Sequence, residues 1–253
     1  MSEFESSVQK KRPEIGFERV FGILCLLTLI LLFINSDFFS IKKLEVKGER
    51  YVSATEIIMR SGLRPRQNIF LIDTGRATAN LLNDPRIAAV TIARRLPDHV
   101  VLVIRERVPR CWMVYRNGFL IISDGGVPID DAGAEPPAGL PLISGVQAGP
   151  VQFGRPLRDA KLEKGLLILK AVDAGLRKYL TELNLDSYRL YLNLPGHSDR
   201  VEVNLGDATQ LAKKLFNLKA IINNVSTRGL VKIDLRIPDV PTVLTGSPEH
   251  ARP

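Results

Sequence analysis

Cysteine and histidine are scarce in this chain, and their scarcity excludes several kinds of site. Cys25 lies inside an apolar run, which leaves Cys111 without a disulfide partner in the rest of the chain. None of the three histidines, His99, His197 and His250, has the HExxH spacing of a metal site. We therefore expect no metal and no other cofactor, and the cysteine count does not assign a redox compartment.

Motifs for catalysis are also missing. The sequence has no GxSxG elbow, SxxK pair or Cys–His pair that would supply a nucleophile. Asp124-Gly125-Gly126 lacks the context of a phosphate-binding loop, and the adjacent Asp130 and Asp131 are weak support for a catalytic site. We expect a protein that is not an enzyme and has no small-molecule substrate.

Aromatic residues make up only 6% of the chain, although its net charge is +8. A nucleic-acid-binding protein would combine clustered lysine and arginine with aromatic side chains that stack on bases. We therefore expect no nucleic-acid partner. The basic excess lies beyond residue 19 and favours acidic partners or anionic lipid headgroups.

One long apolar run, Val20–Ile34, contains no charged residue. As a helix its fifteen residues would span about 22 Å, which is less than the roughly 30 Å of a hydrocarbon core. We therefore predict that a single transmembrane helix continues to Phe39 and occupies residues 20–39. A cleaved signal peptide is the first alternative, but the flank INSDFFSIKK lacks a small-x-small cleavage site. A buried core helix is the second, but the run is apolar on every side.

The basic residues around this run do not determine its orientation. Four precede it and four follow it closely, so the positive-inside rule gives no answer. The polar residues that precede it have no periodicity and are typical of a short disordered tail.

Residues 40–108 show a β-α-α-β-β pattern. Ser53-Ala54-Thr55-Glu56 is a capping box that predicts a helix start, and Gly62 is placed to end that helix. A second helix is predicted from Thr74 to Asn83. Apolar alternation predicts three strands, at Ile41–Val46, Ile87–Arg94 and Val100–Glu106.

The pattern of residues 109–241 predicts a second, mixed α/β domain whose strands are mainly antiparallel. We therefore expect the fold class α+β for the chain. Asn117-Gly118 between two apolar runs predicts a hairpin in which both residues have positive φ. Two helices are predicted, one at 157–176 and one that Asp207 caps and that ends near Asn223. The later strands are predicted at 183–185, 188–194, 201–205 and 230–237, with a disordered tail at 242–253.

The strand predicted at Leu230–Ile237 is a candidate edge of its sheet, because Pro238 and Pro241 follow it and proline cannot donate to a ladder. An exposed edge can accept a partner's strand. The same prolines can instead block such pairing. The residues alone leave both alternatives open.

The order of these parts resembles the FtsQ/DivIB family of bacterial cell-division proteins from residue 17 to about 243. The most specific stretch, NDPRIAAVTIARRLPDHVVLVIRERVP at 83–109, is similar to the family's signature at the end of a POTRA domain. IKKLEVKGERYVSATEI and NIFLID fit the same domain, and VKIDLRIPDV resembles the family's terminal IDLRY segment.

The resemblance implies a cytoplasmic tail (1–19), a single-pass type II inner-membrane helix (20–39), a POTRA domain (40–108), a β-domain (109–241) and a disordered tail (242–253). It places the bulk of the chain outside the membrane, at the division septum. Family members are non-enzymatic scaffolds that bind FtsB/DivIC-like and FtsL-like proteins and other divisome components. They help to govern septal peptidoglycan synthesis.

The resemblance also implies a binding site at which a partner's strand adds to the terminal strand, beside the last helix. The residues implicated are Lys232, Asp234, Arg236, Ile237 and Asp239, with Lys213 and Lys214 as groups that pair with acidic residues. The start of the POTRA domain, near 41–50, is implicated in recruitment to the septum. Ile237 and Pro238 stand where many relatives have an aromatic residue, and the proline leaves the register of the partner strand open.

A POTRA domain also occurs in envelope-assembly and translocation factors, which is the alternative function. Such a factor would carry a membrane β-barrel of alternating strands about ten residues long, and the C-terminal half has no such pattern. An anchored envelope enzyme is a third possibility, and the missing catalytic motifs speak against it.

Overall fold

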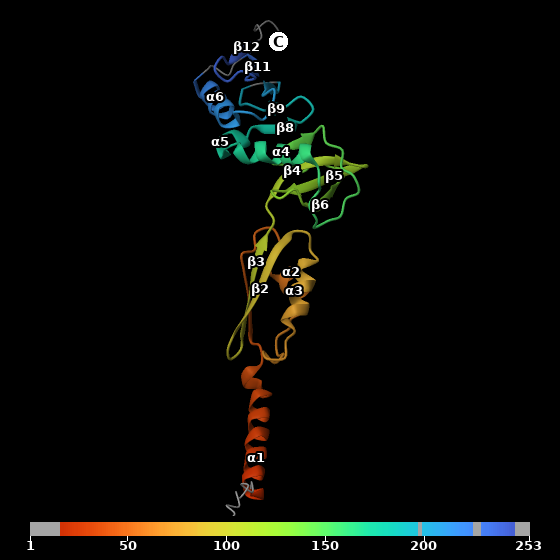
Figure 1. The fold of residues 1–253 in the computed structure, drawn as a ribbon, viewed down its shortest axis with the longest axis vertical. Helices are drawn as coiled ribbons and strands as arrows, with labels where there is room; N and C mark the ends of the chain where they lie inside the picture. The colour runs from red at the N-terminus through yellow and green to blue at the C-terminus, as the bar shows by residue number, and fades with distance from the viewer. Residues whose placement is uncertain (1–15, 197–198, 225–228, 246–253) are drawn as a thin grey trace, which may run out of the picture.

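The computed structural model describes residues 16–196, 199–224 and 229–245. The predictions for most of the N-terminal tail, for His197 and for residues 246–253 lie outside the described residues. Within them the chain forms an apolar helix followed by two folded domains, arranged end to end (Figure 1).

The apolar helix α1 (Phe17–Ile34) has 18 residues, a mean hydropathy of 2.3 and no buried residue. At 1.5 Å per residue it is about 27 Å long. The prediction that it continues to Phe39 is wrong. Asn35 and Ser36 donate side-chain hydrogen bonds to the carbonyls of Leu31 and Phe33, which ends the helix. A short 3₁₀ turn, η1 (Asp37–Phe39), follows.

The first domain confirms the predicted β-α-α-β-β order. Its sheet has the order β1-β3-β2 within the described residues, with β1 parallel and β2 antiparallel to β3. The two helices pack on one face of this sheet (Figure 1). The elements are β1 (Lys43–Lys47), α2 (Ala54–Ser61), α3 (Thr74–Leu82), β2 (Ile87–Arg95) and β3 (His99–Glu106).

Only one of the two hydrogen bonds expected of the capping box before α2 forms. Ser53 accepts the backbone N–H of Glu56, and Gly62 ends the helix with φ +74°, as predicted. The Glu56 carboxylate, however, does not return to Ser53. It accepts hydrogen bonds from Arg60 and Arg86 instead, because Arg86 lies beside it in the folded domain.

The second domain is built on a nine-stranded sheet within the described residues, in the order β12-β11-β10-β9-β8-β7-β4-β5-β6. Five pairings are antiparallel and three are parallel, as the prediction of mainly antiparallel strands requires. Its strands are β4 (Pro109–Tyr115), β5 (Gly118–Ser123), β6 (Pro128–Gly133), β7 (Leu142–Ser144), β8 (Leu180–Asn184), β9 (Arg189–Leu192), β10 (Val201–Asn204), β11 (Leu230–Asp234) and β12 (Thr242–Thr245).

The helices of this domain differ from the prediction in two places. The helix expected at 157–176 is two helices, α4 (Ala160–Ala171) and α5 (Ala174–Arg177), because Asp173 caps a new start by accepting the N–H of Leu176. The last helix, α6 (Leu211–Asn224), begins later than expected. Asp207 does not cap it but accepts hydrogen bonds from side chains.

Two local predictions for the strands are also wrong. The hairpin turn lies at Arg116-Asn117, where Arg116 has φ +53°, and Gly118 already belongs to β5. A Cβ at Gly118 would lie 2.7 Å from the carbonyl oxygen of Gly133 on β6, so the close approach of strands requires this glycine. Thr242–Thr245, expected in a disordered tail, forms β12 and pairs with β11.

Candidate partner-binding surface

The C-terminal end of the second sheet holds most of the residues implicated by the resemblance. β11 pairs with β10 on one side and with β12 on the other. The strand predicted as the sheet edge is therefore internal, and the edge is β12. Pro238 and Pro241 lie in the connection between β11 and β12, outside both ladders.

β12 has a neighbouring strand on one side only, within the described part of the chain. All four of its residues are exposed. Val243 lies opposite the buried Ile233, and Leu244 lies opposite Lys232, so the two side chains point to opposite faces of the sheet. One free ladder edge is thus combined with an apolar side chain on each face.

Further exposed apolar side chains lie on the connection that leads into β12 and on α6, which is bonded to that connection. Ile237 is 65% exposed, Val240 is similarly exposed, and Phe216 on α6 is 72% exposed. Asn217, next to Phe216, donates a hydrogen bond to the Pro238 carbonyl, which holds α6 against the β11–β12 connection. We call these residues the edge surface: Phe216, Ile237, Val240, Val243 and Leu244.

The predicted charged residues at this end pair with one another. Arg236 pairs with Asp234 at 2.8 Å, and Lys213 pairs with Asp239. The hydrogen bond from Arg236 lowers the pKa of Asp234 below its ordinary value. Lys213, Asp239 and Arg236 are exposed, whereas Asp234 is partly buried. Ion pairs at the surface contribute little stability, so a charged partner group can replace one of the exposed members at small cost.

Lys232 lies one strand inside the edge. Its ammonium group is 2.9 Å from the carboxylate of Glu202 on the neighbouring β10. The pair lies on the same face of the sheet as Leu244. Lys232 can therefore border a partner that covers this face, but it is not at the ladder edge.

Lys214 does not belong to the surface. Its side chain is only 1% exposed, and its Nζ donates to the Leu205 carbonyl at 2.7 Å and to the Asp207 carboxylate at 2.6 Å. The hydrogen bond from Lys214 lowers the pKa of Asp207 to about 2. The prediction that Lys214 pairs with an acidic partner residue is therefore wrong, because this buried cation holds the start of α6 to the loop before it.

Sequence reasoning missed the apolar part of the edge surface. The leucines at 211, 215 and 218 mark the buried stripe of α6, and they place Lys214 beside that stripe. Phe216 lies outside this stripe, on the solvent face of the helix. An exposed aromatic residue at such a position could have indicated a binding surface from the sequence alone.

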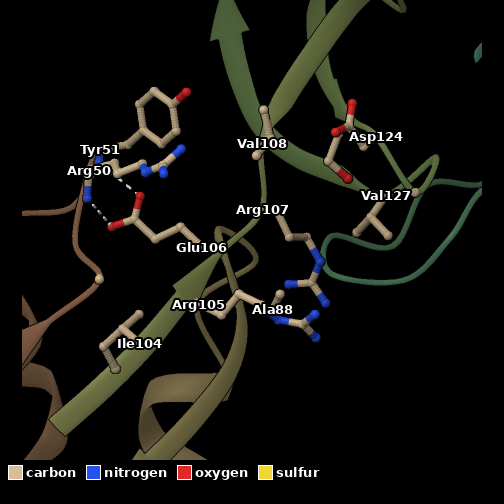
Figure 2. Close-up of a pocket in the computed structure, with 13 residues that line it drawn as sticks. Arg50, Tyr51, Ala88, Ile104, Arg105, Glu106, Arg107, Val108, Asp124 and Val127 are labelled. Atoms are coloured by element: carbon tan, nitrogen blue, oxygen red, sulfur yellow. Dashed lines mark hydrogen bonds between the residues drawn. The ribbon is translucent and has the colours of Figure 1, made fainter. Parts of the chain in front are cut away.

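A cleft of about 640 Å³ lies where the two domains meet (Figure 2). The Glu106 carboxylate in it accepts the backbone N–H groups of Arg50, Tyr51 and Val52 at 2.8–3.2 Å. Arg107 donates to the Pro85 carbonyl at 2.8 Å, and burial lowers its pKa. These groups are used to hold the end of the first domain together, which gives Glu106 and Arg107 a structural role.

The described residues define a class: a protein with an N-terminal apolar helix that fits a membrane anchor, a POTRA domain and a β-rich domain. Residues 39–107 match the family model for the FtsQ-type POTRA domain, and residues 111–236 match that for the C-terminal domain of cell division protein FtsQ/DivIB. Together the matches cover most of the chain. The chain belongs to the FtsQ/DivIB family of cell division proteins.

Curated relatives agree with this assignment. The chain is 28% identical over 217 residues to cell division protein FtsQ of Syntrophotalea carbinolica, covering 79% of this chain and 76% of that protein. It is 24% identical over 206 residues to cell division protein DivIB of Clostridium tetani, covering 80% and 77%. The second family match ends at residue 236, so it does not include β12.

Proposed function

We propose that this protein is a non-enzymatic scaffold of the divisome that captures an FtsB/DivIC-like protein by strand addition to β12. In this proposal the N-terminus is cytoplasmic, and both folded domains lie on the outer side of the inner membrane at the septum. An FtsL-like protein joins the complex, which links divisome assembly to septal peptidoglycan synthesis.

The observation that supports the proposal is the edge of β12, which pairs with no second strand among the described residues and lies within the edge surface. An unpaired strand edge is a template for another strand, and proteins usually protect such edges with charge or irregularity. The opposite edge, β6, is protected in this way, because it carries Asp130 and Asp131 and has register shifts against β5. β12 has no charged residue and is flanked by exposed apolar side chains.

Strand addition also explains how such a surface would select its partner. Main-chain hydrogen bonds to β12 would supply affinity, and alternate partner side chains would meet Val243 on one face and Leu244 on the other. Lys213, Arg236 and Asp239 border this edge in exposed ion pairs, and partner charges would exchange with them. Of the residues implicated by the resemblance, we therefore propose that Lys213, Arg236, Asp239 and Ile237 belong to the binding site. Lys232 and Asp234 are their neighbours on β11.

Site-specific cross-linking tests the proposal in growing cells. A photo-cross-linking amino acid at Leu244 should form a covalent adduct with the FtsB/DivIC-like protein. The same amino acid at Leu167, an exposed leucine on α4, should not. The proposal fails if Leu244 yields no adduct while the two proteins still co-purify, or if both positions yield the adduct equally.

A further inference from the structure

The first domain is attached directly to the end of α1. Asn68 donates a side-chain hydrogen bond to the carbonyl of Ile34, the last residue of α1, at 2.7 Å. The N–H of Ile69 donates to the carbonyl of Phe39, and the Phe39 and Phe70 rings lie 5.0 Å apart. The loop that precedes α3 therefore lies against the C-terminal end of α1.

The turn between β2 and β3 reaches the same place. The N–H of Lys42, just after η1, donates to the Asp98 carbonyl at 2.9 Å. Arg94, at the end of β2, donates to the carbonyl of Ile72 at 2.8 Å, which ties the turn to the loop. Both segments point toward α1 at the lower end of the first domain (Figure 1). We call this end of the domain, residues 37–43, 64–73 and 94–98, the base.

The base exposes several large apolar side chains. Leu71 is 74% exposed and Leu96 is 59% exposed, and Phe38 and Phe70 are exposed as well. They come from three separate segments that the fold brings to one end. Exposed apolar groups that gather in this way mark an interaction surface.

Basic residues accompany these apolar side chains. The base contains six basic residues and three acidic ones, and the basic residues are all exposed: Lys42, Lys43, Arg64, Arg66, Arg94 and Arg95. The guanidinium groups of Arg64, Arg66 and Arg95 make no ion pair within the described residues. Apolar side chains among free basic groups match the chemistry of an anionic bilayer surface.

The length of the apolar helix also indicates that a bilayer contacts the base. The uncharged part of α1, Val20–Ile34, spans about 22 Å, which leaves about 8 Å of a typical hydrocarbon core uncovered. A short span draws flanking residues into the membrane interface or thins the bilayer. The apolar groups of the base lie directly after the end of α1 and can fill the difference.

We propose that the base is a lipid-docking surface that seats the first domain on an anionic leaflet. Phe38, Phe70, Leu71 and Leu96 enter the interface below the headgroups, and the free arginines bind the headgroup phosphates. The occupant is the bilayer in which α1 is anchored. The first domain is therefore held in contact with the membrane surface and does not move freely above it on a linker.

Lipid quenching of a fluorophore tests this in the full chain, reconstituted in nanodiscs. The parent is Cys25→Ser, because burial raises the pKa of the Cys111 thiol to about 12 and keeps it unlabelled. Probes at Leu71→Cys and Leu96→Cys should be quenched by shallow spin-labelled lipid roughly threefold more than a probe at Leu167→Cys. Quenching no greater than at Leu167 would overturn the proposal.

A charge-reversal variant tests the anionic part of the proposal. Arg64→Glu, Arg66→Glu and Arg95→Glu together should lower the quenching of the Leu71→Cys probe about twofold in discs containing phosphatidylglycerol. The matched control reverses the same charge on exposed residues of the second domain and should have no effect: Arg155→Glu, Arg158→Glu and Lys164→Glu. Equal quenching in pure phosphatidylcholine, with no effect of the base variant, would show that anionic lipid is not the occupant.

Discussion

Leu244 and Ile237 are exposed apolar side chains at the proposed binding edge, and replacing both with alanine measures how much of them a partner covers. Complete burial of a leucine or isoleucine side chain contributes about 1.5–3 kcal/mol. Leu244 is 60% exposed and Ile237 is 65% exposed in the free protein. A partner strand that covers the exposed part would gain about 1–2 kcal/mol from each.

Alanine keeps one methyl group, so each substitution should remove about 1 kcal/mol of binding free energy. Each single variant should then bind about fivefold more weakly, and the double variant Leu244→Ala plus Ile237→Ala about 30-fold more weakly. The thermal unfolding of the free protein should change only slightly, because more than half of each side chain already lies in water.

The assay is the dissociation constant of the full chain for the extracytoplasmic part of the FtsB/DivIC-like partner, measured by biolayer interferometry. Leu167→Ala is the matched control, since Leu167 on α4 is an equally exposed leucine away from β12, and it should bind within about twofold of the parent. Binding of the double variant within the same range would refute the reasoning, and so would an equal loss in the control.

Two further predictions concern the stability of the first domain. Gly48→Ala should cost about 3 kcal/mol or more, since φ is +89° and a Cβ would lie 2.2 Å from the Ile104 carbonyl oxygen. Gly62→Ala has φ +74°, but its Cβ would meet only Asn80 Nδ2 at an ordinary contact distance of 3.7 Å, so it should cost about half as much in urea unfolding. For Asp84, burial is outweighed by hydrogen bonds from Arg86, so its pKa is lowered. The Asp84–Arg86 pair should therefore stabilise the domain fully above about pH 4, and this contribution to the free energy of unfolding should be lost as the pH falls below that value. Asp84→Asn should remove this contribution and the pH dependence that it causes. Unchanged acid unfolding of Asp84→Asn would contradict the second prediction.

The first domain could be predicted from the sequence because its signals are local. Ser53 and Gly62 mark the ends of α2 through their own backbone and side-chain chemistry. Alternation of apolar residues places β2 and β3 within one residue of their observed bounds. The family signature at 83–109 covers these two strands, so pattern and resemblance agree there.

The second domain was less predictable because the conformation and packing of some of its residues are determined by strands that are distant in the sequence. Gly118 was interpreted as a turn residue, yet its conformation is ordinary and its missing side chain admits the Gly133 carbonyl of β6. β6 itself had not been predicted, so the reason for the glycine could not be read locally. A hairpin was predicted here and is present, but its turn lies at Arg116-Asn117, one residue before the predicted pair.

The candidate site shows the same limit. Thr242–Thr245 is a four-residue strand between Pro241 and a segment rich in glycine, serine and proline, so its composition favoured a tail. Pairing with β11 makes it a strand, and that pairing moves the sheet edge outward by one strand. Lys214 was counted as a surface charge although its spacing placed it beside the buried stripe of α6. A charge on a buried stripe needs an internal partner, and Asp207 supplies it.

The sheet order adds a geometric requirement for the partner. The residues around β5 and β6 line the cleft at the first domain, whereas β12 is at the other edge of the same sheet. Eight strand spacings of about 4.8 Å separate β6 from β12, or about 38 Å across the sheet. If the base is seated on the membrane, β12 stands farther from the bilayer than the whole first domain (Figure 1). A partner anchored in the same membrane must therefore carry its edge-binding strand at the far end of an extended segment, as a coiled coil would.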